Sequence, residues 1–222
     1  MYLHKTNVLI RKMFPRFVWK QDTTEKVIYL TFDDGPTPEI TNWTLNVLKQ
    51  YNAKATFFCI GNNIEKHPKI FQDILNDDHA IGNHTHDHIK GWKTKTADYL
   101  KDITKTQAVI LNQMHESNSG ARNDVSLKLF RPPYGQITPK QGKKLIALGY
   151  KIIMWDVLSF DWSKTVKQEN CLNNVLTKTT SGSIIVFHDS VKASKNMQYT
   201  LPQVLEHFSK NGYVFKALND AF

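Results

Sequence analysis

Short apolar runs alternate with amphipathic stretches along most of the chain. Runs rich in β-branched and aromatic residues predict buried strands over 27–32, 55–60, 80–82, 127–130, 151–157, 183–187 and 213–217. Between them, the helical spacing of apolar residues predicts helices over 39–51, 64–77, 96–114, 137–148, 166–178 and 197–210. Strand followed by helix, repeated along one chain, is typical of an α/β fold with parallel strands and helical crossovers. The alternation itself is compatible with either a doubly wound sheet or a closed barrel.

The composition fits one globular domain. The chain has 222 residues, of which 41% are hydrophobic and 22% charged, so a sizeable core is expected. The sequence contains no internal repeat or low-complexity tract, and residues 118–124 predict a surface loop. We therefore expect one folded domain over residues 25–222, preceded by a basic segment over residues 1–24.

The basic segment allows two interpretations. Its longest apolar run, residues 8–10, is too short for a secretory signal peptide, and no run in the chain is long enough to cross a membrane. The segment is either an amphipathic helix touching a membrane surface or, as we favour, a stretch that packs across the closed end of a barrel. These features predict a cytoplasmic or membrane-peripheral location, unless a leader is missing from this sequence. Up to residue 20 it carries no acid and the basic residues Lys5, Arg11, Lys12, Arg16 and Lys20.

The charge of the whole chain limits the classes of binding partner that we expect. The formal net charge is +9, but the basic residues are scattered among acids and no nucleic-acid recognition motif is found. We therefore expect no nucleic-acid partner, whereas contact with a membrane or an anionic polymer stays open. The only cysteines are Cys59 and Cys171, which provide no disulfide framework, and Cys59 lies in an apolar run typical of a core.

The first candidate functional residues directly follow the strand predicted over 27–32. Asp33 and Asp34 come at its carboxyl end, and Gly35-Pro36 then turns the chain. In α/β folds this edge of the sheet is where ligands bind. One carboxylate could hold a metal ion while the other handles a proton. The alternative is that both cap the helix that follows.

A histidine-rich motif, Asn83-His84-Thr85-His86-Asp87-His88, follows the strand predicted over 80–82. The four-residue spacing of His84 and His88 places both imidazoles on one face of a helical turn, within reach of one metal ion. Asp34 could supply a third ligand, which would leave positions open for water and substrate. We expect His86 and Asp87 to face solvent. The alternative is a polar loop that is rich in histidine by chance.

Three further strand ends carry polar groups. Arg131-Pro132-Pro133-Tyr134-Gly135 predicts a stiff loop that can present backbone N–H groups, with Arg131 available to bind a carboxylate; the alternative is an ordinary turn. The strand predicted over 151–157 runs on to Asp161 and Trp162, and the strand predicted over 183–187 ends at His188. Convergence of so many functional groups at one edge is hard to explain by packing.

These motifs, in this order from Thr31 to His188, resemble those of the polysaccharide deacetylase family, also called carbohydrate esterase family 4 or the NodB-homology domain. The resemblance implies a distorted (β/α) barrel of about seven parallel strands in a single domain. It also implies one divalent metal ion, zinc in the first place and cobalt, nickel or manganese as alternatives. The implied roles are metal binding by Asp34, His84 and His88, general base for Asp33, orientation of Asp33 by Arg131, oxyanion stabilisation by the backbone N–H of Tyr134, general acid for His188, orientation of His188 by Asp161, and an acetyl-methyl pocket lined by Trp162 and Val186.

Two positions depart from the family pattern. The last motif is usually Leu-x-His, whereas this chain has Val186-Phe187-His188, so the acetyl pocket is expected to be slightly larger. Leu158 stands where many members have an acid. Neither change removes a group that the implied chemistry needs.

The implied activity is metal-dependent removal of N-acetyl groups from N-acetylglucosamine-containing glycans, peptidoglycan or chitin-like oligosaccharide, with release of acetate. An alternative is a hydrolase of the same fold that acts on a non-polymeric amide or an acylated lipid-linked sugar. A less favoured alternative is an inactive glycan-binding module. Which glycan is used, including an O-acetylated xylan, depends on loops that the sequence does not describe, and no pattern indicates an oligomeric state.

Overall fold

The computed structural model describes residues 5–116 and 128–222, and a parallel sheet forms the centre of this part of the chain. The strands pair in the order β5-β4-β3-β2-β1-β7-β6, and β8 pairs with the start of β1; every strand pairing is parallel. The predicted α/β class and parallel strands are therefore confirmed. The strands are β1 (Val27–Asp33), β2 (Ala55–Cys59), β3 (Ala80–Asn83), β4 (Lys128–Phe130), β5 (Tyr150–Ile152), β6 (Val157–Leu158), β7 (Ile184–His188) and β8 (Val214–Phe215).

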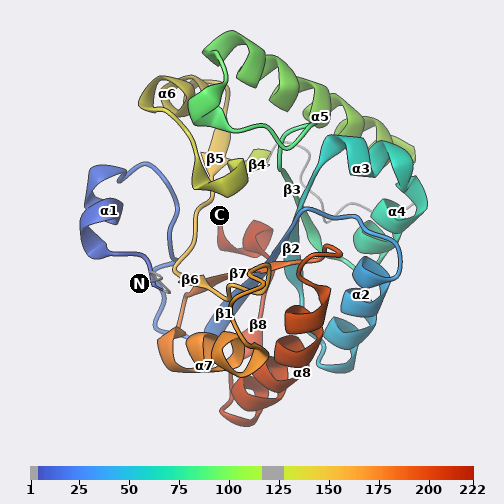
Figure 1. Cartoon of the computed structure of the whole chain (residues 1–222), viewed down its shortest axis with the longest axis vertical. Coiled ribbons are helices and arrows are strands. Elements are labelled where there is room, and N and C mark those ends of the chain that lie inside the picture. Colours follow the sequence, from blue (N-terminus) through green and yellow to red (C-terminus); the bar gives the residue numbers. More distant parts are fainter. Residues whose placement is uncertain (1–4, 117–127) are drawn as a thin grey trace.

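The sheet curls into a distorted barrel, and the N-terminal segment lies where its two ends face each other. Within the described residues β5 and β6 do not pair, and Val18 instead bridges to Ile153 beside β5. Lys5 bridges to Val157 in β6, and α1 (Val8–Met13) stands at the margin of the molecule (Figure 1). The predicted barrel thus includes residues from before the first strand in its wall.

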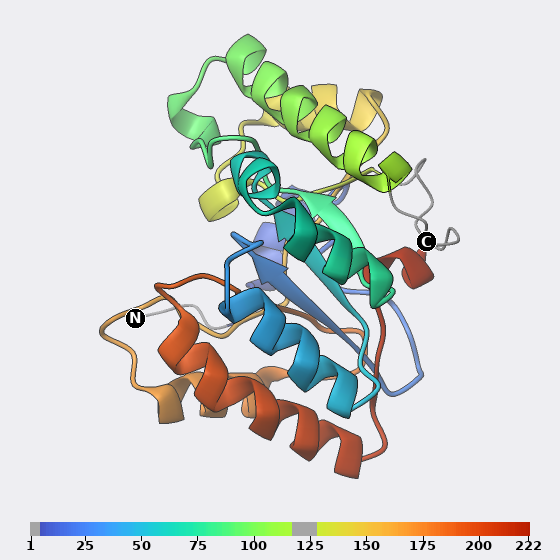
Figure 2. The ribbon, with the colours of Figure 1, turned by 90° about the vertical axis from the view of Figure 1, so that its right-hand side faces the viewer.

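Helices surround the sheet. They are α2 (Ile40–Gln50), α3 (Gly61–Lys66), α4 (Pro68–Asn76), α5 (Thr96–Glu116), α6 (Pro139–Ala147), α7 (Gln168–Lys178) and α8 (Ser194–Lys210). Figure 2 shows α2 and α8 side by side on one flank of the sheet, with α4 and α5 continuing the layer above them.

Two predicted elements are each divided in the structure. The single helix predicted over 64–77 is split into α3 and α4 at His67, because Pro68 starts a new helix at its first turn. The strand predicted over 151–157 is split into β5 and β6, because Met154 N–H donates to the carbonyl of Val18 in the N-terminal segment. The predicted surface loop, 118–124, and residue 127 of the predicted fourth strand lie outside the described residues.

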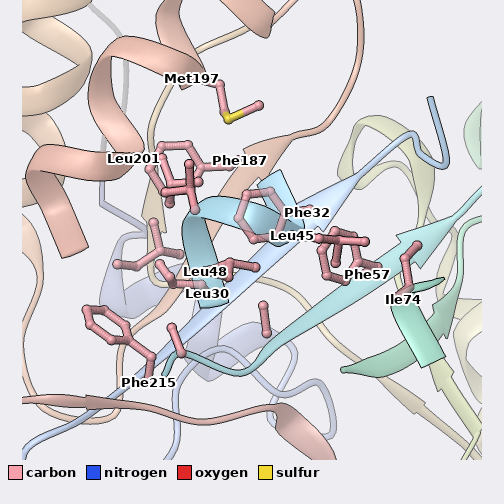
Figure 3. Close-up of a cluster of buried hydrophobic side chains, with 14 of the residues drawn as sticks. Leu30, Phe32, Leu45, Leu48, Phe57, Ile74, Phe187, Met197, Leu201 and Phe215 are labelled. Atoms are coloured by element: carbon pink, nitrogen blue, oxygen red, sulfur yellow. The ribbon is translucent and has the colours of Figure 1, made fainter. Parts of the chain in front are cut away.

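The largest apolar cluster fixes the central strand. Phe32 of β1 stacks between Phe57 of β2 and Phe187 of β7, with ring centroids 5.0 and 6.0 Å away (Figure 3). Leu48 of α2 and Leu201 of α8 cover these rings from the helical layer, and all five side chains are buried. Such packing gives β1 little freedom to move, so the residues at its carboxyl end are held in place.

Candidate metal and catalytic site

The carboxyl ends of the strands surround one pocket of about 520 Å³. Arg131 and Asp161 lie behind its wall, where each contacts a lining residue. The structure therefore brings together every residue that the sequence proposed for the site. Those lining the pocket are Asp33, Asp34, His84, His88, Tyr134, Trp162, Val186 and His188.

Asp34, His84 and His88 form a compact group of possible metal ligands. Oδ1 of Asp34 lies 3.2 Å from Nε2 of His88 and 3.6 Å from Nε2 of His84. Asp34 and His88 both have left-handed backbone conformations, with φ of 81° and 52°, which turn their side chains toward a common point. Among the described residues this is the one group of three or more such side chains that could share an ion.

The charge states of this group suit a cation. Nδ1–H of His84 donates to the carbonyl of Arg131 at 2.8 Å, so the lone pair on Nε2 faces Asp34. Burial lowers the pKa of His84 to about 4, which keeps the ring neutral. Burial raises the pKa of Asp34, but His88, His188 and His84 outweigh it and hold that pKa well below its usual range. Oδ1 of Asp34 is buried and faces Nε2 of both His84 and His88, as expected of an atom placed to bind an ion.

Asp33 is fixed by a buried arginine. Nη1 of Arg131 donates to Oδ1 of Asp33 and to Oγ1 of Thr31, both at 2.7 Å. The guanidinium also donates to the carbonyls of Ile153 at 3.2 Å and Met154 at 2.9 Å. Burial lowers the pKa of Arg131 and Asp33 counteracts that effect. The result is a carboxylate with a fixed direction at the floor of the pocket.

His188 is fixed by a second buried carboxylate. Nδ1 of His188 lies 2.9 Å from Oδ1 of Asp161, and its backbone N–H donates to Oδ2 at 2.7 Å. The ring of Trp162 lies 4.7 Å from the His188 ring, measured between centroids. Burial alone would lower the pKa of His188, but Asp161, together with Asp34 and Asp33, raises it to about 9. His188 therefore carries a proton that it can donate at neutral pH.

The loop after β4 forms the opposite wall. Tyr134 sits in a short 3₁₀ turn, Pro133–Gly135, with a left-handed backbone at φ 59°. Its ring centroid lies 4.6 Å from that of His88, and the residue is 56% exposed at the mouth of the pocket. Trp155, Leu158 and Lys192 also line the pocket. Leu158 stood out in the sequence only as a departure from the family pattern, and Trp155 and Lys192 were not predicted for the site.

The expectation that His86 faces solvent is wrong. His86 is only 3% exposed, and its ring nitrogens lie 3.2 Å from Glu65 in α3 and 2.9 Å from Asp87. Its backbone N–H donates to Asp102 of α5 at 2.5 Å. Spacing within the motif could not reveal that α3 and α5 pack against the outside of the turn. Asp87 is exposed, as predicted.

One supporting residue was missed. Asp189, directly after His188, is fully buried and accepts hydrogen bonds from the backbone N–H of Gly35 at 3.1 Å and from Oγ1 of Thr41 at 2.5 Å. Burial raises its pKa to about 8. A Cβ added to Gly35 would lie 2.0 Å from Oδ2 of Asp189, so this contact requires glycine. The acid that follows His188 was the available signal.

The fold and this site define a family. Residues 20–153 match the family described as Polysaccharide deacetylase, and the chain belongs to it. Two Bacillus cereus proteins named peptidoglycan-N-acetylglucosamine deacetylase are similar to the chain. One is 40% identical over 163 residues, which cover 73% of this chain and 56% of that protein; the other is 30% identical over 204 residues, which cover 91% of each.

The chain is also similar in structure to solved peptidoglycan deacetylases. The crystal structure of the Bc1960 peptidoglycan N-acetylglucosamine deacetylase superposes with a TM-score of 0.86 at 31% identity, over 98% of this chain and 97% of that one. The peptidoglycan deacetylase PdaC from Bacillus subtilis superposes with a TM-score of 0.75 at 30% identity, over 90% and 91%. The chain spans just over half of the first relative but nearly all of the Bc1960 structure.

Proposed function

We propose that this protein removes N-acetyl groups from N-acetylglucosamine-containing glycans, with peptidoglycan as the first candidate, and releases acetate. One observation carries the proposal: a possible three-ligand metal site, a clamped carboxylate and a protonated histidine all meet in one pocket. The names of the relatives support peptidoglycan as the substrate.

Asp34, His84 and His88 would hold the metal. One carboxylate and two imidazoles suit zinc, which is our first proposal, while cobalt, nickel and manganese also accept this donor set. When bound there, the ion would polarise the acetyl carbonyl and lower the pKa of a water molecule.

The residues around the metal site have separate roles in the proposed reaction. Asp33, held by Arg131, takes a proton from the attacking water, and the backbone N–H of Tyr134 donates to the oxygen that becomes negative. His188, held by Asp161, donates its proton to the leaving amine as the carbon–nitrogen bond breaks. The products are acetate and a free amino sugar. Trp162 and Val186 line the pocket beside the acetyl methyl group.

The first test is acetate release from N-acetylated chito-oligosaccharides and from peptidoglycan. Protein treated with a chelator should be inactive, and added zinc or cobalt should restore activity. The better substrate then identifies the glycan. Release from neither glycan, with metal shown to be bound, would contradict the proposal and favour the alternative of a non-polymeric amide or a lipid-linked sugar.

We also propose that the 1–24 segment packs on the barrel of the catalytic domain over 25–222 and contacts an anionic lipid surface. Leu9 and Met13 of α1 are 67% and 71% exposed, and the exposed Lys12 lies between them in the same helix. In the part of the chain that the structure describes, no helix has the length and apolarity to span a bilayer. Sedimentation with phosphatidylglycerol vesicles should exceed that with phosphatidylcholine vesicles and fall in a Leu9→Asn/Met13→Asn variant. Equal sedimentation in all three cases would contradict contact.

A further inference from the structure

A second cavity, of about 480 Å³, opens beside the catalytic pocket. It lies where the chain between β6 and α7 meets the start of α8, and α7 and α8 lie side by side at the foot of Figure 1. The proposed hydrolysis does not use it. We call it the lysine groove, because its lining includes Lys164, Lys167, Lys192 and Lys195.

The groove carries unbalanced positive charge. All four lysines are exposed, and none forms an ion pair with an acid of the described residues. Two acids also line the groove, but the carboxylate of Asp161 is engaged by His188 and only Glu169 is exposed. Several like charges around one hollow repel each other and favour an anion between them.

The groove borders the site of reaction. Lys192 lines both the groove and the catalytic pocket. Asp161 lies on the groove wall, and its partner His188 faces the catalytic pocket. A substrate that extends from the catalytic pocket toward Lys192 therefore approaches the other groove lysines.

The groove is also preformed. Nδ2 of Asn196 in α8 donates to the carbonyls of Asp161 at 3.2 Å and Val166 at 3.1 Å. These bonds fix the loop that carries Lys164 against the helix that carries Lys195. A wall held in this way loses little conformational freedom when a ligand binds.

We propose that the lysine groove is a subsite for an acidic group, a carboxylate or a phosphate, on the sugar next to the one that is deacetylated. This inference rests on the proposed function and narrows its substrate to an acidic N-acetylated glycan. A neutral chitin-like chain would fill the catalytic pocket but leave the lysines without a partner.

The test compares disaccharides of similar size by NMR titration of the full chain loaded with zinc, in an Asp33→Asn background that prevents consumption of the probes. The neutral probe is N,N′-diacetylchitobiose, and the acidic probe is N-acetylglucosaminyl-N-acetylmuramic acid. In a Lys164→Gln/Lys167→Gln variant we expect the affinity for the acidic probe, relative to the neutral one, to fall about tenfold, because two exposed charges each contribute a few-fold. Added salt should reduce the same preference.

A matched variant controls for overall charge. Lys143→Gln/Lys144→Gln removes two exposed lysines from α6, away from the groove, and should keep the preference. N,N′-diacetylchitobiose 1-phosphate, which carries its phosphate on the second sugar, compared with N,N′-diacetylchitobiose tests phosphate as the source of the charge. Loss of preference for either acidic probe in the groove variant alone supports the subsite. No preference for either acidic probe, or equal losses in both variants, overturns it.

The binding and turnover measurements test the subsite and the proposed function separately. If wild-type protein releases no acetate while the groove variant still loses its preference for an acidic probe, the proposed function fails and the anion subsite stands. If acetate is released and the groove variant binds every probe as the control does, the subsite fails and the proposed function stands.

Discussion

Arg131 is the largest side chain that is fully buried in the described structure. Its guanidinium is compensated by Asp33, Thr31 and two backbone carbonyls, so the charge has partners on several sides. Buried ion pairs often add little net stability, but removal of one partner leaves an uncompensated charge. The Arg131–Asp33 pair therefore both orients the Asp33 carboxylate and affects the stability of the fold.

The first prediction follows from this pair. Arg131→Met should lower the free energy of unfolding by about 3–5 kcal/mol, because the Asp33 carboxylate stays buried without its partner. Adding Asp33→Asn should recover part of the loss, since the remaining group is neutral. Urea unfolding of the two single variants and the double variant measures the coupling. Strictly additive losses would show that the two residues do not act as a pair.

Variants of the neighbouring residues Asp33 and Asp34 should distinguish the general base from the metal ligand. We expect Asp33→Asn to reduce kcat at least about 100-fold while zinc remains bound, because the variant cannot accept a proton. Asp34→Ala should instead lose the metal, because one of three ligands is removed. Acetate release and metal content, measured on the same samples, distinguish the roles. An Asp33→Asn variant with near-normal kcat would contradict the assignment of the base.

His188 should set the alkaline limit of activity. Its pKa is raised from 6.5 to about 9 against the effect of burial, with Asp161 as the main cause, so the ring is protonated at neutral pH. Activity that needs this proton falls as pH rises through that pKa. The stability that the charged ring contributes is likewise complete below pH 6.5 and is lost as pH rises through about 9. In Asp161→Asn the alkaline limb of the pH–rate profile should move to lower pH. An unchanged limb would exclude His188 as the titrating acid.

At the scale of elements, local sequence patterns correctly predicted the strands and helices that depend on them. Features that depend on contacts between residues far apart in the sequence were not predicted. The strand before Asp33 and the helix over 39–51 depend on apolar periodicity, and the structure has β1 and α2 at those places. The break within 151–157 depends on Val18, more than a hundred residues away, and no local pattern contains it. His86 was misplaced for the same reason, because its partners come from α3 and α5.

Helix α5 supports the histidine turn from outside. Asp102 accepts from the backbone N–H groups of His86 at 2.5 Å and Asp87 at 3.4 Å, between the two proposed ligands. Asp102→Ala should weaken zinc binding about 10- to 100-fold, as loss of a group that orients metal ligands typically does. Asp98→Ala, an exposed acid in the first turn of the same helix, is the control. A chelator competition assay measures both, and equal affinities would contradict support by α5.

At the scale of the whole molecule, the N-terminal segment is joined to the far end of the sheet. Asp156, fully buried beside β6, forms an ion pair with Arg11 of α1 and accepts from Oγ of Ser183 at 2.5 Å. The backbone N–H of Thr6 also donates to the carbonyl of Asp156 at 3.0 Å. Segment and barrel therefore share buried polar contacts.

The ion pair between Arg11 and Asp156 should contribute to the free energy of unfolding of the whole protein. Arg11→Met should lower the free energy of unfolding by about 1–3 kcal/mol, because Asp156 loses its closest cation while it stays buried. Lys12→Met removes the neighbouring exposed charge in the same helix and should change stability by less than about 0.5 kcal/mol. Urea midpoints compare them. Equal midpoints would mean that the segment is not coupled to the barrel.

The pairing of residues 5–20 with the far end of the sheet also orders the folding of the chain in time. Lys5, Val18 and Lys20 bridge to residues at 157, 153 and 183, and β1 pairs with β7. On a ribosome, the first residues emerge long before their partners are synthesised. The nascent chain must therefore keep a basic, apolar-containing segment and one flank of β1 unpaired until the last third of the protein appears. Closure is accordingly a late event of high contact order, and we expect it to limit the rate of folding.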